Sequence, residues 1–131
     1  MRTLPRIGTY FASPLPTYGT ARYDRILALV GATYPNEPVF EPRHLFAGHD
    51  DWRAQWPDIV RSIARLVFFA NDDGSLGAGV VRELHDARWH NVPIAFASDD
   101  GTLVSTYTLE FTSADDPARV AFVVAQSEGA R

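Results

Sequence analysis

The strongest candidate for a functional site in this sequence is an acidic, glycine-rich segment followed by a glutamate. The polar residues Asn71–Asp73 follow the apolar run Leu66–Ala70, and Gly74–Gly79 contains three glycines and Ser75. A glycine-rich turn lets the backbone approach a ligand closely, and the start of a following helix attracts anions. Glu83, four residues beyond Gly79, is then either a solvated helix glutamate paired with an arginine or a carboxylate that faces a ligand.

A second candidate group follows the first apolar run of the chain. Tyr10 lies inside the run Ile7–Ala12, and Ser13 and Pro14 end it. Ligands of open parallel sheets bind beyond the carboxyl ends of the strands. We therefore expect Ser13 and the segment Asn71–Asp73 to border a binding site, in which the Ser75 hydroxyl contributes to an anion site.

Other chemistries find little support. The glycine segment lacks the lysine of a phosphate-binding P-loop, and its spacing differs from the dinucleotide fingerprint. The chain has no cysteine, and His85 and His90 are five residues apart, so they do not share a helix face. We expect no metal and no cofactor. Trp52 and Trp56 have the spacing of core residues on a helix, although one of them, with Trp52 as the candidate, can stack on a base.

Composition limits the class of protein. The 131 residues suit one domain, and the net charge of −4 argues against binding to a nucleic-acid polymer. No apolar run is long enough to span a membrane, and the run after Met1–Arg6 is too short for a signal peptide. We expect a cytoplasmic protein.

Hydrophobic periodicity predicts alternating strands and helices. The expected strands are Ile7–Ala12, Val39–Phe40, Leu66–Ala70, Pro93–Ala97, Thr102–Phe111 and Val120–Ala125, the last being either a strand, which we favour, or a terminal helix. The expected helices are one capped by Thr20 and running to about Ala32, one capped by Asp50 or Asp51 with a kink or restart at Pro57, and Gly79–His90, ended by Asn91. Arg43–Gly48 is expected to be irregular.

This order of elements predicts the fold class. Strands that alternate with helices form a mostly parallel sheet with helices on both faces. We expect one Rossmann- or flavodoxin-like α/β domain over residues 1–131, with about five strands.

Several short segments together resemble the nucleoside 2-deoxyribosyltransferase-like superfamily. They are Tyr10–Pro14, Leu66–Asp73, the glycine segment, Glu83-Leu84-His85-Asp86-Ala87 and Val92-Pro93-Ile94. The family includes nucleoside deoxyribosyltransferases and N-glycosidases of nucleoside 5′-monophosphates. The resemblance covers residues 7 to 97, and its motifs are more specific for fold than for activity.

The resemblance implies roles for individual residues. Glu83 corresponds to the catalytic nucleophile, and Tyr10 to an aromatic residue beside it. Asp72 or Asp73 corresponds to the acidic residue that holds sugar hydroxyls or helps to protonate the base. The resemblance also implies that the following residues contact substrate: Ser13, Pro14, Ser75, Gly77, Gly79 and Trp52. Of these, Ser75 and Ser13 are the implied phosphate contacts.

The implied activity is cleavage or transfer of an N-glycosidic bond through a glycosyl-enzyme ester. The implied partner is a nucleoside or nucleotide substrate, and the family's shared pockets favour a homodimer. His85 stands where the family usually has glycine. A non-catalytic nucleotide-binding or sensing module is therefore a second hypothesis, and a flavodoxin-like interaction domain without a ligand is a third.

Overall fold

Five strands form the central sheet of the computed structural model, which describes residues 6–105 and the backbone of 109–113 and 119–124. The sheet order is β2-β1-β3-β5-β6, with the first four strands parallel and β6 antiparallel to β5. The strands are β1 (Thr9–Ala12), β2 (Val39–Phe40), β3 (Arg65–Phe68), β5 (Ile94–Ala97) and β6 (Leu103–Ser105). The expected Rossmann-like α/β fold is confirmed.

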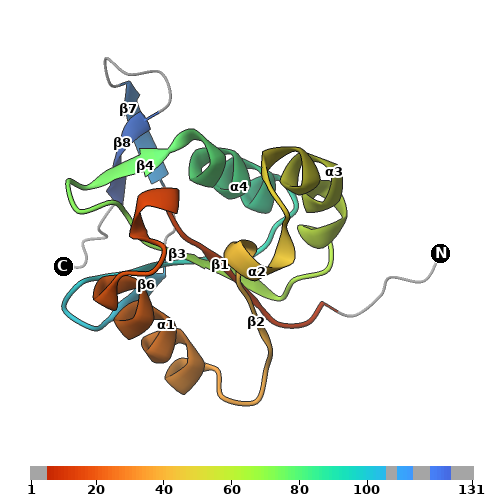
Figure 1. The fold of residues 1–131 in the computed structure, drawn as a ribbon, viewed down its shortest axis with the longest axis horizontal. Coiled ribbons are helices and arrows are strands. Elements are labelled where there is room, and N and C mark those ends of the chain that lie inside the picture. Colours follow the sequence, from red (N-terminus) through yellow and green to blue (C-terminus); the bar gives the residue numbers. More distant parts are fainter. Residues whose placement is uncertain (1–5, 106–108, 114–118, 125–131) are drawn as a thin grey trace.

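Helices cover both faces of this sheet (Figure 1). Helix α1 (Ala21–Thr33) lies on one face, and α2 (Pro42–Leu45), α3 (His49–Ile59) and α4 (Ala78–Trp89) lie on the other. A short 3₁₀ helix, η1 (Leu15–Thr17), connects β1 to α1. The carboxyl ends of β1 and β3 therefore meet η1, the start of α1 and the chain that leads into α4.

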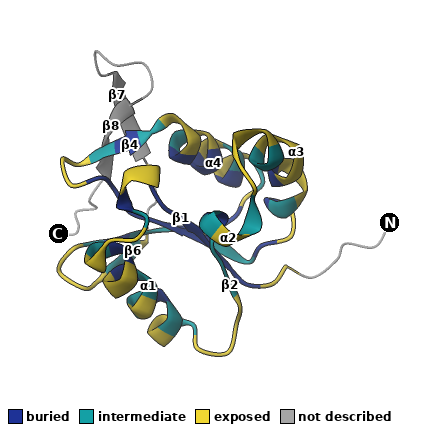
Figure 2. Cartoon of the chain, in the orientation of Figure 1, coloured by how far each residue is buried: buried dark blue, intermediate teal, exposed yellow. Residues whose placement is uncertain are grey.

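The central strands are buried on both sides, which explains their uninterrupted apolar sequences (Figure 2). Tyr10 and Ala12 of β1 join the core beneath α3 and α4. Phe11, between them, joins the core beneath α1. Because side chains alternate along a strand, this register fixes Tyr10 on the α4 side of the sheet.

Two helix boundaries follow the sequence signals. The Thr20 hydroxyl accepts a hydrogen bond from the Tyr23 backbone N–H at 3.1 Å and so caps α1. Helix α4 ends at Trp89, and Asn91 then adopts the left-handed conformation with φ 59°. Asparagine tolerates this conformation better than most residues do, so it ends α4 as expected.

The segment between β2 and α3 differs from expectation. Residues 42–45 of the supposedly irregular stretch form α2, because Pro42 suits the first position of a helix. Helix α3 is preceded by Gly48, so Asp50 and Asp51 lie in its first turn and do not cap it. The helix continues through Pro57 and ends two residues later, without a restart.

A second, antiparallel sheet was not expected. Its order is β4-β8-β7, formed by β4 (Ser75–Gly77), β7 (Leu109–Ser113) and β8 (Arg119–Val124). Part of the glycine segment is therefore strand, and Thr102–Phe111 is not one strand, since β6 and β7 belong to different sheets. The expected strand at Val120–Ala125 is confirmed as β8, with Ala125 outside the described residues. No helix in the described part of the chain is long and apolar enough to cross a membrane.

Candidate active site at Glu83

Glu83 is a buried carboxylate on the second turn of α4. Only 4% of its surface is exposed, and it lies on the face of α4 that also buries Val80, Leu84 and Ala87. The alternative of a solvated helix glutamate is therefore wrong. A carboxylate in such a position has to be hydrogen-bonded, because burying an unpaired charge is costly.

Two aromatic side chains provide those hydrogen bonds. The Tyr10 hydroxyl donates to Oε2 of Glu83, and the Trp52 indole N–H donates to the same oxygen at 2.9 Å. Tyr10 comes from β1 and Trp52 from α3, so three elements converge on one carboxylate. Oε1 takes part in neither bond. The structure thus brings together three of the residues expected at the site.

The charge state of Glu83 reflects opposing effects. The pKa of Glu83 is raised from 4.5 to about 7 as a net result: burial raises it most, the hydrogen bonds from Tyr10 and Trp52 lower it, and the nearby charge of Asp86 raises it. Burial and the Glu83 charge raise the pKa of Tyr10 far above its ordinary value. Tyr10 therefore stays protonated and remains a donor to Glu83 at every physiological pH.

Ser13 and Tyr18 lie close to this group. Ser13 is buried at the end of β1, and its hydroxyl donates to the Phe11 carbonyl at 3.4 Å. Burial raises the pKa of Tyr18, the hydrogen bond with Ser13 lowers it, and the charge of Glu83 raises it. Tyr18 is therefore within electrostatic reach of Glu83. The sequence analysis missed Tyr18, which has no motif around it.

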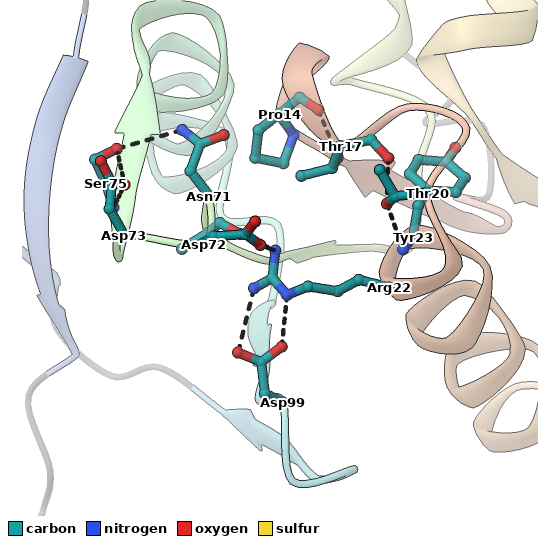
Figure 3. A network of polar contacts seen from close by, with 11 residues as sticks. Pro14, Thr17, Thr20, Arg22, Tyr23, Asn71, Asp72, Asp73, Ser75 and Asp99 are labelled. Carbon is teal, nitrogen blue, oxygen red and sulfur yellow. Dashed lines mark hydrogen bonds and ion pairs between the residues drawn. The ribbon is translucent and has the colours of Figure 1, made fainter.

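Asp72 and Asp73 border a separate hollow at the carboxyl end of β3 (Figure 3). This cavity of about 310 Å³ is lined by Pro16, Thr17, Thr20, Arg22, Asn71, Asp72 and Asp73. Its volume is at the lower end of the range for small-molecule sites. Glu83 is not among the lining residues, so the expected catalytic residues form two groups.

The glycine segment has a defined conformation between these groups. Both the backbone N–H and the hydroxyl of Ser75 donate to Oδ1 of Asp73, at 3.0 and 2.5 Å. Gly77 precedes α4 without a side-chain capping bond, and a Cβ at Gly77 or Gly79 would meet no other atom within 4 Å. Chain packing alone therefore does not require glycine at either position.

Pro14, another expected site residue, precedes η1, and its carbonyl accepts a hydrogen bond from the Thr17 hydroxyl at 2.6 Å.

Asn71 and Arg22 also line the cavity, and of the two only Arg22 was not expected there. The position of Asn71 after a buried strand is the signal that placed it at the expected binding edge. Nothing in the sequence connects Arg22 to β3, 43 to 46 residues away, because only the parallel sheet places the start of α1 beside the end of β3.

No group of three or more His, Asp or Glu side chains within the described ranges is arranged to hold a metal ion. Comparison with protein-family models, curated proteins and solved structures gives no match. The function is therefore inferred from the geometry and from the motif resemblance.

Proposed function

We propose that this protein cleaves or transfers the N-glycosidic bond of a nucleoside or nucleoside 5′-monophosphate, with Glu83 as the nucleophile. The observation that carries the proposal is the buried Glu83 carboxylate, oriented through Oε2 by Tyr10 and Trp52. A carboxylate fixed by two donors from other elements is preorganised for attack. Oε1, which takes part in neither bond, is the oxygen that would attack.

The reaction proceeds in two steps in this proposal. Oε1 of ionised Glu83 attacks the anomeric carbon, the bond to the base nitrogen breaks with its electron pair, and a glycosyl ester forms. Water or a second base then attacks the same carbon and releases the carboxylate, as in retaining glycosidases. The base nitrogen takes up a proton from water as it leaves, and the Asp72 or Asp73 carboxylate orients that water.

The charge state of Glu83 determines the pH range of this reaction. Because attack requires the carboxylate, the rate is expected to rise with pH through the pKa of about 7 and then to level off. The hydrogen bonds from Tyr10 and Trp52 oppose the effect of burial and keep a useful fraction ionised at neutral pH.

A non-catalytic nucleotide-binding module is the second candidate function. The observation that favours it is the same raised pKa, since a partly protonated Glu83 bound to Tyr10 and Trp52 also suits a structural polar cluster in the core. This function predicts saturable nucleoside binding without release of base over hours. The resemblance further implies a homodimer, which stays a prediction.

Base release from nucleosides and nucleoside 5′-monophosphates, followed by chromatography, tests the proposal. Glu83→Gln should reduce release by at least about a thousandfold, because the amide keeps the acceptor oxygen but is not a nucleophile. Glu37→Gln is the matched control, since Glu37 lies away from the site on the surface and pairs with Arg65. Equal rates in the wild type and Glu83→Gln would refute the role of Glu83. Repeating the assay with a second free base separates transfer from hydrolysis.

A further inference from the structure

The hydroxyl donors that line the cavity beside β3 are already committed within the protein. The Thr17 hydroxyl donates to the Pro14 carbonyl at 2.6 Å, and the Thr20 hydroxyl donates to the Thr17 carbonyl at 2.6 Å (Figure 3). A hydroxyl has a single proton to donate. Neither threonine can therefore donate to a ligand without losing its present bond.

Arg22, the cationic residue of the cavity lining, also donates its hydrogen bonds to other protein atoms. Its Nε donates to Asp99 at 2.7 Å, its Nη1 to the Ala70 carbonyl at 2.6 Å, and its Nη2 to Asp99 at 3.4 Å. Nη1 also lies 3.4 Å from a carboxylate oxygen of Asp72. With two carboxylates around it, the guanidinium gives the cavity no excess of positive charge.

Asn71 lines the cavity and has an acceptor atom without a partner in the described part of the chain. The Ser75 hydroxyl uses its proton on Asp73, so Ser75 can only accept from Asn71, which donates through Nδ2 at 3.3 Å. This assigns the amide orientation and turns Oδ1 away from Ser75 (Figure 3). Asn71 is only 7% exposed, and Oδ1 is buried without a hydrogen-bond partner in the described part of the chain. Buried polar atoms in proteins nearly always have a partner.

The remaining polar groups of the lining are acidic. The Asp72 side chain is 91% exposed and reaches Arg22 only at 3.4 Å, so its oxygens can accept further bonds. Asp73 adds a second carboxylate to the rim. The cavity thus combines accepting oxygens and negative charge, which attracts hydrogen-bond donors and repels anions.

We propose that this cavity binds the uncharged, donor-bearing part of a nucleoside, with Asn71 Oδ1 accepting a hydrogen bond from a base amino group or a sugar hydroxyl, and that phosphate does not enter it. The inference rests on the proposed function for the choice of nucleosides as ligands. It adds Asn71 as a residue that sets specificity, and it places any phosphate contact outside this cavity.

Isothermal calorimetry on the Glu83→Gln protein tests the inference without turnover. Adenosine is compared with purine riboside, and cytidine with pyrimidin-2-one riboside, because each pair differs by one amino group. The 2′,3′-dideoxy forms of adenosine and cytidine lack the 2′- and 3′-hydroxyls instead, and the 5′-deoxy forms lack the 5′-hydroxyl. We expect one of these changes to weaken binding about tenfold, which identifies the group that Asn71 contacts. Inorganic phosphate should leave the affinity unchanged.

Variants of Asn71 provide the second arm. Asn71→Leu in the Glu83→Gln background removes the acceptor at similar volume and should weaken binding of the preferred nucleoside about tenfold or more. Asn36→Leu is the matched control, since Asn36 is exposed and far from the cavity. If Asn71→Leu does not fold, the analogue series on the protein that retains Asn71 decides the question alone.

Three results would overturn the inference: no nucleoside binds, the analogues bind as tightly as the parent compounds, or phosphate displaces them. Base release by the wild type is scored separately. Donor-dependent binding without base release would refute the proposed function and leave the cavity assignment intact. Base release by the wild type, together with nucleoside binding that Asn71→Leu does not weaken, would support the proposed function and refute the cavity assignment.

Discussion

Tyr10 and Trp52 oppose the effect of burial on the charge of Glu83. Both donors stabilise the carboxylate, whereas burial and Asp86 favour the protonated acid. The balance places the pKa near neutrality, where a modest change in either direction alters the ionised fraction strongly. The ionisation of the proposed nucleophile is therefore controlled by two neighbouring side chains, Tyr10 and Trp52.

Replacing Tyr10 by phenylalanine should move this balance in a known direction. The lost hydrogen bond no longer lowers the pKa of Glu83, so the midpoint of the pH–rate profile should shift above 7, and the rate at neutral pH should fall. The pH dependence of base release measures the shift. Tyr23→Phe is the matched control, because Tyr23 is equally buried but donates to Glu41 at 2.8 Å. A midpoint that moves down or stays in place would contradict this account.

Helices α3 and α4 are joined by a hydrogen bond one turn away from the site. The Trp56 indole N–H donates to Asp86 at 2.9 Å, and Arg82 donates to the same carboxylate oxygen at 3.0 Å. Trp56 also packs against the Tyr10 ring, with centroids 4.7 Å apart. This contact holds α3, and with it Trp52, over Glu83.

Trp56→Phe should therefore destabilise the fold by about 2 kcal/mol, since it removes a buried donor to a charged group and part of a packed ring. Urea unfolding measures the change. Trp89→Phe, the same substitution at a position of α4 that is 82% exposed, should stay within about 0.5 kcal/mol of the wild type. Equal effects of the two substitutions would show that the contact between α3 and α4 contributes nothing.

Long periodic elements were predictable, whereas short ones depended on tertiary pairing. Helix α1 has a capping threonine and an apolar face, and β3 has a continuous apolar run, so local sequence determines both. Strand β4 has three residues and exists because it pairs with β8, more than 40 residues later. No local pattern contains that pairing, and the segment was therefore expected to be a loop.

The tertiary packing of the whole molecule determines which candidate residues lie together. Sequence reasoning predicted that residues after β1 and β3 lie at one edge of the sheet, and it named Glu83, Tyr10 and Trp52 as site residues. It could not predict that Tyr10 and Trp52 bind the same oxygen, because that depends on the packing of β1, α3 and α4. It also could not place Asp72 and Asp73 on a cavity that Glu83 does not line.

The free energy of unfolding should depend on pH because Glu83 is buried. Its pKa is about 7 in the folded protein and close to the ordinary 4.5 when unfolded. Between these values the folded state binds more protons than the unfolded state, so stability falls as pH rises from about 4.5 through 7. Below pH 4.5 Glu83 is protonated in both states and causes no loss.

The expected loss is roughly 3 kcal/mol between pH 4.5 and 8, from a shift of about 2.5 pKa units at 1.36 kcal/mol each. Urea unfolding of the wild type and Glu83→Gln across this range isolates it, since the other titrating groups are common to both proteins. The free energy of unfolding of the wild type should decline relative to the variant, with an unchanged denaturant slope. Parallel curves would mean that Glu83 titrates normally and is not buried as the structure describes.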